Sequence, residues 1–249
     1  MRIENSFIPV RGVGETTERR LWRDGITRWE EFDPSAVGPK TGDRVESFVA
    51  TAWEHLDDGN AEFFAEQFPQ GSHWRLHENF RSETCYFDIE TTGLSPDHNE
   101  VTTVSFHQDG ETTTLVRGED LTADRIAEQF ADASLVATFN GKRFDVPFLE
   151  SSFDVSVDCP HVDLMYPCKQ LGLTGGLKAI ERDIGLERDR PDISGEDAVR
   201  LWREYEAGDD DALDTLISYN REDTANLATL METVTDRLHE DVFACECPE

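Results

Sequence analysis

The chain has 249 residues, of which 53 are acidic and 23 basic, giving a formal net charge of −30 at pH 7. Its hydrophobic content of 37% is enough for a packed core, which excludes wholesale disorder in spite of the charge. No apolar run reaches the length of about 18 residues that a membrane-spanning helix needs. The first residues also lack the apolar stretch of a secretory signal. We therefore expect a cytoplasmic protein without membrane contact.

The basic residues are mostly arginines, since only four of the 23 are lysines, and the acidic residues are spread along the chain rather than gathered in a tail. This composition resembles that of proteins from salt-accumulating halophiles such as haloarchaea, in which concentrated salt screens dense like charge. The alternative is an acidic protein with basic partners. Because salt adaptation imposes acidity whatever the function, the net charge does not exclude nucleic-acid binding.

Residues 1–80 are predicted to form a small helical segment, whose first 44 residues hold equal numbers of acidic and basic side chains. In the stretch GVGETTERRLWRDGI, a Gly-x-Gly turn at Gly12 and Gly14 precedes a predicted helix. The pattern resembles a helix-hairpin-helix motif, in which backbone N–H groups bind nucleic-acid phosphate. Gly12 and Gly14 are the candidate contacts. A plain helical hairpin without phosphate contact fits the same residues.

Two further helical patterns follow in this segment. Ile26, Trp29 and Phe32 recur at a period of about 3.6 residues, as on the apolar face of a helix. After the Gly-Pro turn, Thr41 is the predicted N-cap of another amphipathic helix. Helical patterning then continues to a polar boundary near residue 83.

Strands replace helices from residue 84. The stretches CYFDIETT, EVTTVSFHQ and ETTTLVR predict three strands, the last two joined by a tight Asp109-Gly110 turn. An amphipathic helix, a buried strand (LVATFN), a helix starting in FDVPFL and a largely helical stretch over 164–236 follow. This order predicts an α/β fold in which helices flank a mixed sheet. We expect the domain to span 84–238 and to be followed by an unstructured tail, 239–249.

Four acidic residues stand in apolar surroundings, which matters because acid-x-acid spacing arises by chance in so acidic a chain. Asp88 and Glu90 interrupt an apolar strand and project from the same face. Asp145 lies between a buried strand and the start of a helix. Asp223 follows Tyr219 by one helical turn, so that ring and carboxylate share a face.

Burying like charges is costly unless cations lie between them. The four carboxylates would be balanced by two divalent cations, and all-oxygen ligands suit Mg²⁺ or Mn²⁺. Paired divalent ions are the usual means of in-line attack on a phosphodiester. The residues alone therefore indicate a metal-dependent nuclease.

Three motifs in chain order, FDIETTGL, FNGKRFDVPFL and YNREDTANL, resemble the exonuclease motifs of the DEDD superfamily, which has a ribonuclease H-like fold. The tyrosine at Tyr219 is similar to that of the tyrosine-bearing branch. The spacing of Asn140, Phe144 and Asp145 looks like that of family-B polymerase proofreading domains. The stretch from DLMYPCKQ to DTANL is closer to the YprB-type ribonuclease H-like family. The resemblance spans about residues 84–236.

This resemblance implies a 3′–5′ exonuclease acting on DNA or RNA, with a single-stranded 3′ end as the favoured substrate. It implies that the metal ligands are Asp88, Glu90, Asp145 and Asp223. It implies that Tyr219 positions the attacking water. One ion would lower the pKa of that water, and the other would stabilise the leaving 3′-oxygen.

Other polar residues near the motifs are candidates for substrate binding. Asn140 and Phe144 fall on family positions that shape the site. Lys142 and Arg143 precede Asp145 and could meet phosphates, as could Lys178 and Arg221, although surface charges balancing nearby acids are an equal alternative.

Two other functions fit the same fold. One is a non-catalytic nucleic-acid-binding or scaffolding protein, against which the presence of the tyrosine and all four acids counts. The other is a proofreading or repair subunit that acts beside a polymerase or helicase.

Overall fold

The longest helix, α10 (Asp210–Val242), contributes to both of the units into which the chain divides. The computed structural model describes residues 1–248. One unit is Ser82–Thr233, and the other is Met1–Arg81 together with the chain from Val234 onward. The final turns of α10 therefore pack with the N-terminal elements, whereas the predicted domain extends to residue 238.

The N-terminal unit consists of short helices and 3-10 turns. Helix α2 begins at Pro39, whose fixed φ suits the first helical position, so the predicted N-cap at Thr41 is wrong. In chain order the elements of this part are η1 (Ile3–Asn5), α1 (Glu15–Arg23), η2 (Trp29–Glu31), η3 (Pro34–Ala36), α2 (Pro39–Asp57), α3 (Ala61–Gln67), η4 (Gln70–Leu76), α4 (His77–Phe80) and η5 (Arg81–Glu83).

The apolar series after α1 does not form the helix that its spacing predicts. Only the single 3-10 turn η2 is present there. The Glu31 carboxylate accepts hydrogen bonds from the backbone N–H groups of Thr27 and Arg28 at 2.7 and 2.9 Å. These bonds close a tight turn, which helical periodicity in the apolar residues does not reveal.

The predicted unstructured tail is also wrong, because α10 continues to Val242 and the 3-10 turn η6 (Ala244–Glu246) follows. The Glu246 carboxylate accepts hydrogen bonds from Arg19 and Arg23 of α1 at 3.0 and 2.5 Å. The tail therefore packs within the N-terminal unit.

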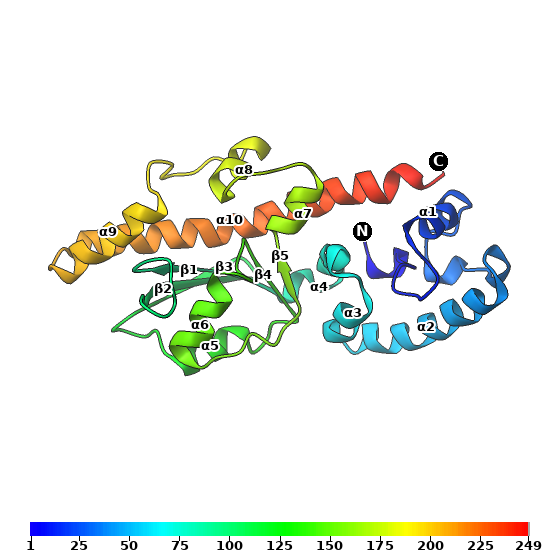
Figure 1. Cartoon of the computed structure of the whole chain (residues 1–249), viewed down its shortest axis with the longest axis horizontal. Helices are drawn as coiled ribbons and strands as arrows, with labels where there is room; N and C mark the ends of the chain where they lie inside the picture. The colour runs from blue at the N-terminus through cyan, green and yellow to red at the C-terminus, as the bar shows by residue number, and fades with distance from the viewer. Residues whose placement is uncertain (249) are drawn as a thin grey trace. The chain divides into compact units, whose positions relative to one another are not determined.

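The second unit contains one mixed sheet with the strand order β3-β2-β1-β4-β5 (Figure 1). β1, β2 and β3 pair antiparallel, whereas β4 pairs parallel to both β1 and β5. This arrangement confirms the predicted α/β fold with a mixed sheet. The elements are β1 (Thr84–Thr91), β2 (Val101–Gln108), β3 (Glu111–Val116), α5 (Ala123–Phe130), β4 (Leu135–Thr138), α6 (Asp145–Phe153), β5 (His161–Asp163), α7 (Met165–Gln170), α8 (Leu177–Ile184), α9 (Gly195–Glu206) and the first part of α10.

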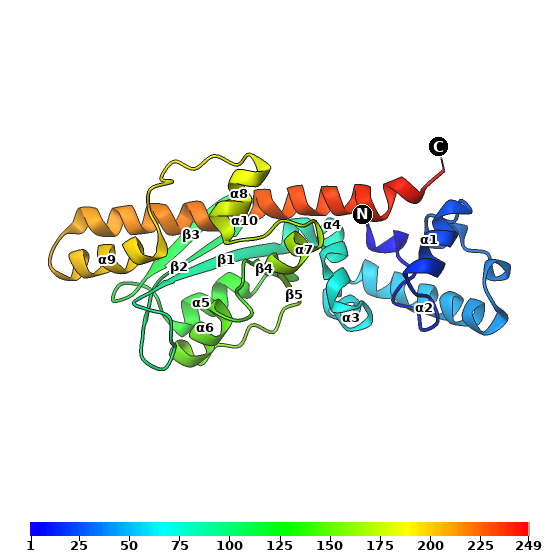
Figure 2. The same ribbon diagram turned by 45° about the horizontal axis from the view of Figure 1, so that its top comes forward.

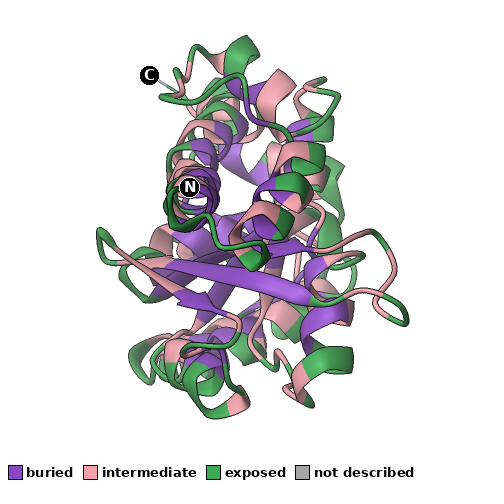
Figure 3. Cartoon of the chain, turned by 90° about the vertical axis from the view of Figure 1, so that its left-hand side faces the viewer, coloured by how far each residue is buried: buried purple, intermediate pink, exposed green. Residues whose placement is uncertain are grey.

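Helices cover both faces of this sheet: α5 and α6 lie on one face, and α10 crosses the other (Figures 1 and 2). Phe87 and Ile89 of β1 pack in a core with α5 and α6. Strand β1 and most of β2 are buried, whereas much of the edge strand β3 is partly exposed; exposed positions gather on the outer sides of helices and on loops (Figure 3). Because side chains alternate along a strand, the even-numbered residues of β1 face α10. Within residues 1–248, no helix has the length and apolar character that a membrane crossing requires.

Candidate metal centre

Strand β1 carries two carboxylates to the face of the sheet that α10 covers. Asp88 is half-buried and Glu90 is buried, one residue before a bulge in the pairing with β2. Asn220 of α10 donates from Nδ2 to Asp88 Oδ2 at 2.7 Å. Its Oδ1 accepts a hydrogen bond from Thr103 of β2 at 3.0 Å. This amide joins the helix to two strands and sets the orientation of Asp88.

Helix α10 supplies the third carboxylate and a tyrosine. Tyr219 and Asp223 are both buried and lie one helical turn apart on the side of α10 that faces the sheet. One carboxylate oxygen each from Asp88, Glu90 and Asp223 lie within 4.8 Å of one another. Residues separated by more than 130 positions in the chain thus converge on one cluster.

Asp145 lies in the first turn of α6 and approaches β1 from the side of β4. The pairing of β4 with β1 runs only from Thr84 to Tyr86, so the N–H of Ile89 has no strand partner on that side. Asp145 Oδ1 accepts this N–H at 3.2 Å. The early end of β4 therefore creates the position that the Asp145 carboxylate fills.

Burial raises the pKa of all four carboxyl groups. For Asp88 and Glu90, the neighbouring carboxylates raise the pKa further. Burial raises the pKa of Asp145 to about 7. At Asp223 burial also raises the pKa, although the charge of Arg188 opposes the rise. Without a compensating cation, the cluster is electrostatically unfavourable as four carboxylates.

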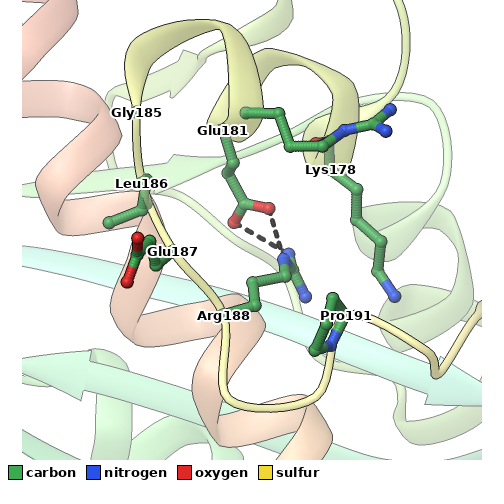
Figure 4. A pocket seen from close by; sticks show the side chains of 8 residues that line it. Lys178, Glu181, Gly185, Leu186, Glu187, Arg188 and Pro191 are labelled. Atoms are coloured by element: carbon green, nitrogen blue, oxygen red, sulfur yellow. Dashed lines mark hydrogen bonds and ion pairs between the residues drawn. The ribbon is translucent and has the colours of Figure 1, made fainter.

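Two cationic side chains border the cluster, from α8 and from the segment that follows it. The Lys178 ammonium lies 4.6 Å from the centroid of the Tyr219 ring, and its Nζ makes no hydrogen bond within residues 1–248. Arg188 is bonded both to Glu181 and to Asp223. Figure 4 shows the Glu181–Arg188 pair with the Lys178 side chain beside it.

Sequence reasoning missed Glu181, Arg188 and Asn220. Acidic and basic residues are too frequent in this chain for one of them to stand out. A usable signal is present nonetheless: Glu181 takes an apolar-face position in the helical series Leu177, Ile180 and Ile184. A carboxylate at such a position is buried, and a buried carboxylate requires a partner. Asn220 likewise falls on the buried face of α10.

The other predicted site residues surround the Asp145 loop. Asn140 adopts a positive φ of 64°, and its backbone N–H donates to Asp163 at 2.7 Å. Phe144 packs on Phe148 with 4.9 Å between ring centroids, so its partly buried ring lies against the core. Lys142 and Arg143 are exposed.

The two glycines predicted to contact phosphate lie in the N-terminal unit, in the turn before α1, and both are exposed. Gly12 has a positive φ of 104°, and a Cβ placed on it would come within 3.3 Å of the Thr41 hydroxyl. Glycine is therefore required there by the backbone conformation and close packing.

The donor set fits a hard divalent cation. All candidate ligands are carboxylate oxygens, they converge from three elements, and burial makes their combined negative charge costly. No thiol or imidazole group belongs to the cluster of Asp88, Glu90 and Asp223.

A family model described as RNase_H superfamily matches residues 85–235, which include all the acids of the site. No curated protein matches the chain significantly.

Several solved structures are similar to this chain at low sequence identity. A structure described as the apo form of a nuclease is 21% identical, with a TM-score of 0.47 over 67% of this chain and 81% of the other. NrnC of Brucella melitensis bound to pGG is 17% identical, with a TM-score of 0.45 over 68% and 82%. The family B DNA polymerase of Pyrobaculum calidifontis is 17% identical, with a TM-score of 0.46 over 62% of this chain and 24% of the polymerase. These TM-scores are low, so the family assignment rests on the match over residues 85–235.

Proposed function

The chain belongs to the RNase_H superfamily, and from that premise we propose that it is a metal-dependent nuclease, specifically a 3′–5′ exonuclease that hydrolyses DNA or RNA. One observation carries the proposal: three buried or half-buried carboxylates have oxygens within 4.8 Å of one another. A fourth, Asp145, bonds to the same strand. Such a cluster is costly to keep in a fold unless cations use it.

Asp88, Glu90, Asp145 and Asp223 would hold two divalent cations, Mg²⁺ or Mn²⁺. When bound, such ions supply a water of lowered pKa and neutralise the charge that develops on a phosphodiester. The protein supplies orientation. Asn220 fixes the Asp88 carboxylate, and the Ile89 N–H fixes that of Asp145.

Tyr219 would position the attacking water. Burial raises the pKa of its phenol, and the nearby carboxylates of Asp223 and Glu90 raise it further, so the hydroxyl stays protonated and can donate a hydrogen bond. The Lys178 ammonium, which has no hydrogen-bond partner in the described chain, lies over the Tyr219 ring and is available to a phosphate oxygen.

The favoured substrate is a single-stranded 3′ end. Lys142, Arg143 and the loop of Asn140 and Phe144 would contact it beside Asp145. In the N-terminal unit, backbone groups at Gly12 and Gly14 would contact phosphate. A polymerase, helicase or repair protein is the proposed kind of partner.

The test is degradation of 5′-labelled single-stranded DNA and RNA in molar KCl with Mg²⁺ or Mn²⁺. We expect a ladder that shortens from the 3′ end, disappears with a chelator and disappears in the variant Asp88→Asn. The matched control is Asp132→Asn, which neutralises an exposed acid away from the cluster. A circular single strand should resist, because it offers no end.

Each alternative has its own outcome. Cleavage of the circle would replace the exonuclease with an endonuclease. Failure of the folded, metal-loaded protein to cleave either nucleic acid would reject the catalytic proposal in favour of a binding or partner-dependent role.

A further inference from the structure

Arg188 lies between the buried carboxylate of Glu181 and the Asp223 carboxylate of the candidate metal centre. Its Nε and Nη2 donate to the two oxygens of Glu181, the latter at 2.8 Å (Figure 4). Its Nη1 donates to Asp223 Oδ1. The side chain is only 5% exposed. One planar guanidinium therefore joins α8 to α10 at the edge of the cluster.

Glu181 holds this guanidinium rigidly. The carboxylate is fully buried, and its Oε1 also accepts a hydrogen bond from Asn226 of α10 at 3.0 Å. Two parallel N–H···O bonds fix both the position and the plane of an arginine. Only Nη1 is left pointing away from Glu181, and it points at the metal centre.

The bond to Asp223 uses a carboxylate oxygen that a cation would also use. A positive group on Asp223 Oδ1 and an ion bound at the cluster compete for the same lone pairs and repel each other. The hydrogens of Nη1 would then require another acceptor. A pocket of about 660 Å³ adjoins this point, and its charged lining residues are Lys178, Arg182 and Arg188 together with Glu181 and Glu187. Its cationic side chains are suited to an anionic oxygen.

We propose that Arg188 is a positioning residue for the substrate: anchored by Glu181, its Nη1 exchanges the Asp223 carboxylate for a phosphate oxygen when divalent cations occupy the cluster. The exchange keeps the Glu181 fork intact, so a small displacement of one nitrogen suffices. The phosphate role rests on the proposed nuclease function, whereas the competition with cations does not.

The competition is tested without nucleic acid, by titrating the free protein with Mn²⁺ and measuring unbound Mn²⁺ by electron paramagnetic resonance. Arg188→Gln removes the competing charge, so we expect Mn²⁺ to bind about tenfold more tightly than in the wild type. Arg190→Gln, two residues away on the exposed side of the same segment, should leave the affinity unchanged. If Arg188 only supports Asp223 structurally, its loss would weaken Mn²⁺ binding, and that result overturns the proposal.

The phosphate contact is tested with oligonucleotides that carry one uncharged methylphosphonate linkage at successive positions from the 3′ end. In the wild type we expect one linkage at which neutralisation raises KM markedly. Arg188→Gln should have a raised KM for the normal strand and no further penalty at that linkage. An equal penalty in both proteins would overturn the contact.

Further variants separate the proposal from misfolding and from failure of the nuclease function. Arg188→Lys keeps the positive charge but cannot form two parallel hydrogen bonds with Glu181. Its Mn²⁺ affinity should therefore be close to that of the wild type, whereas its KM should stay closer to that of Arg188→Gln. Glu181→Gln weakens the anchor of Arg188 and should therefore raise KM. Thermal melts should show that each of these variants is folded. A wild type that cleaves nothing rejects the nuclease proposal, whereas the Mn²⁺ comparison still decides the competition.

Discussion

Asn220 donates a 2.7 Å hydrogen bond to the Asp88 carboxylate while its own carbonyl oxygen accepts the hydroxyl of Thr103. The amide is completely buried and lies on α10 between Tyr219 and Asp223. Because both ends of the amide are engaged, its orientation is fixed. Asn220 therefore sets the register of α10 on the sheet and brings Asp223 opposite Asp88 and Glu90.

Replacing Asn220 by Ala should lower both stability and activity. The change leaves the Thr103 hydroxyl and a carboxylate oxygen buried without their partner, which costs about 1–3 kcal/mol of unfolding free energy. Urea denaturation measures this loss, and the nuclease assay should show a larger loss than stability alone explains. Thr229→Ala, at an exposed position of the same helix, is the control. Equal stability of the two variants would contradict the role given to Asn220.

Neutralising Asp88 should stabilise the metal-free protein. Burial and the charges of Asp145, Asp223 and Glu90 raise the pKa of Asp88, which reflects the cost of its ionised form. Asp88→Asn removes that cost while its oxygen can still accept the Asn220 amide, so we expect a gain of about 1 kcal/mol or more in unfolding free energy at pH 8.

Asp223→Asn is the matched comparison, because Asp223 is paired with Arg188. Its neutralisation removes the negative charge that compensates the buried Arg188 guanidinium, although the amide oxygen can still accept its hydrogen bond, so we expect no gain or a loss of stability. Denaturation in chelator measures both variants. An equal gain in unfolding free energy for both variants would show that pairing with Arg188 does not protect Asp223 from the charge repulsion in the cluster.

His77 should make the stability of the N-terminal unit depend on pH. Burial, followed by the charge of Arg81, lowers the pKa of this imidazole to about 4. A histidine whose pKa is lowered by folding is neutral in the folded state, so its stability contribution is complete above pH 6.5 and is lost as the pH falls towards 4.

Wild type should therefore lose up to about 3 kcal/mol more than His77→Gln over this interval. Urea denaturation at a series of pH values gives the difference. His98→Gln, in an exposed loop, should follow the wild type. Parallel curves for wild type and His77→Gln would mean that the imidazole titrates normally in the folded protein.

Much of the second unit is predictable because its patterns are local. The alternation in CYFDIETT places Asp88 and Glu90 on one face whatever covers that face, and the structure shows that α10 does. Apolar flanks likewise separate Asp145 and Asp223 from the many solvated acids. Metal binding by these four residues depends on the folded chain together with its ions, and it stays a prediction.

Other features depend on partners far apart in the sequence. The role of Asn220 depends on its hydrogen bond with Thr103, which is 117 residues away in the chain. The role of Arg188 depends in the same way on its bond with Asp223. The predicted helix around Trp29 fails for a related reason. A single glutamate, Glu31, closes the turn through backbone N–H groups, and apolar periodicity carries no information about such bonds.

High salt should preserve activity and raise stability. The chain has 53 acidic against 23 basic residues, and their mutual repulsion weakens as the Debye length falls to about 3 Å at 1 M salt. We expect the thermal unfolding midpoint to rise from low salt to molar KCl, with cleavage retained there. Loss of cleavage in molar KCl by a protein that is still folded would reject the halophilic interpretation.

Tyr219→Phe should separate catalysis from metal binding. The ring packs under the Lys178 ammonium and among the apolar side chains of α9 and α10, and Phe preserves these contacts. Only the hydroxyl is lost, so folding and Mn²⁺ affinity should remain close to those of the wild type. If the hydroxyl orients the attacking water, kcat should fall about 10²-fold or more with little change in KM.

Asp223→Asn, by contrast, should weaken Mn²⁺ binding directly. A Tyr219→Phe variant with unchanged kcat would assign the tyrosine to packing, and a variant with weakened Mn²⁺ binding would assign it to support of Asp223.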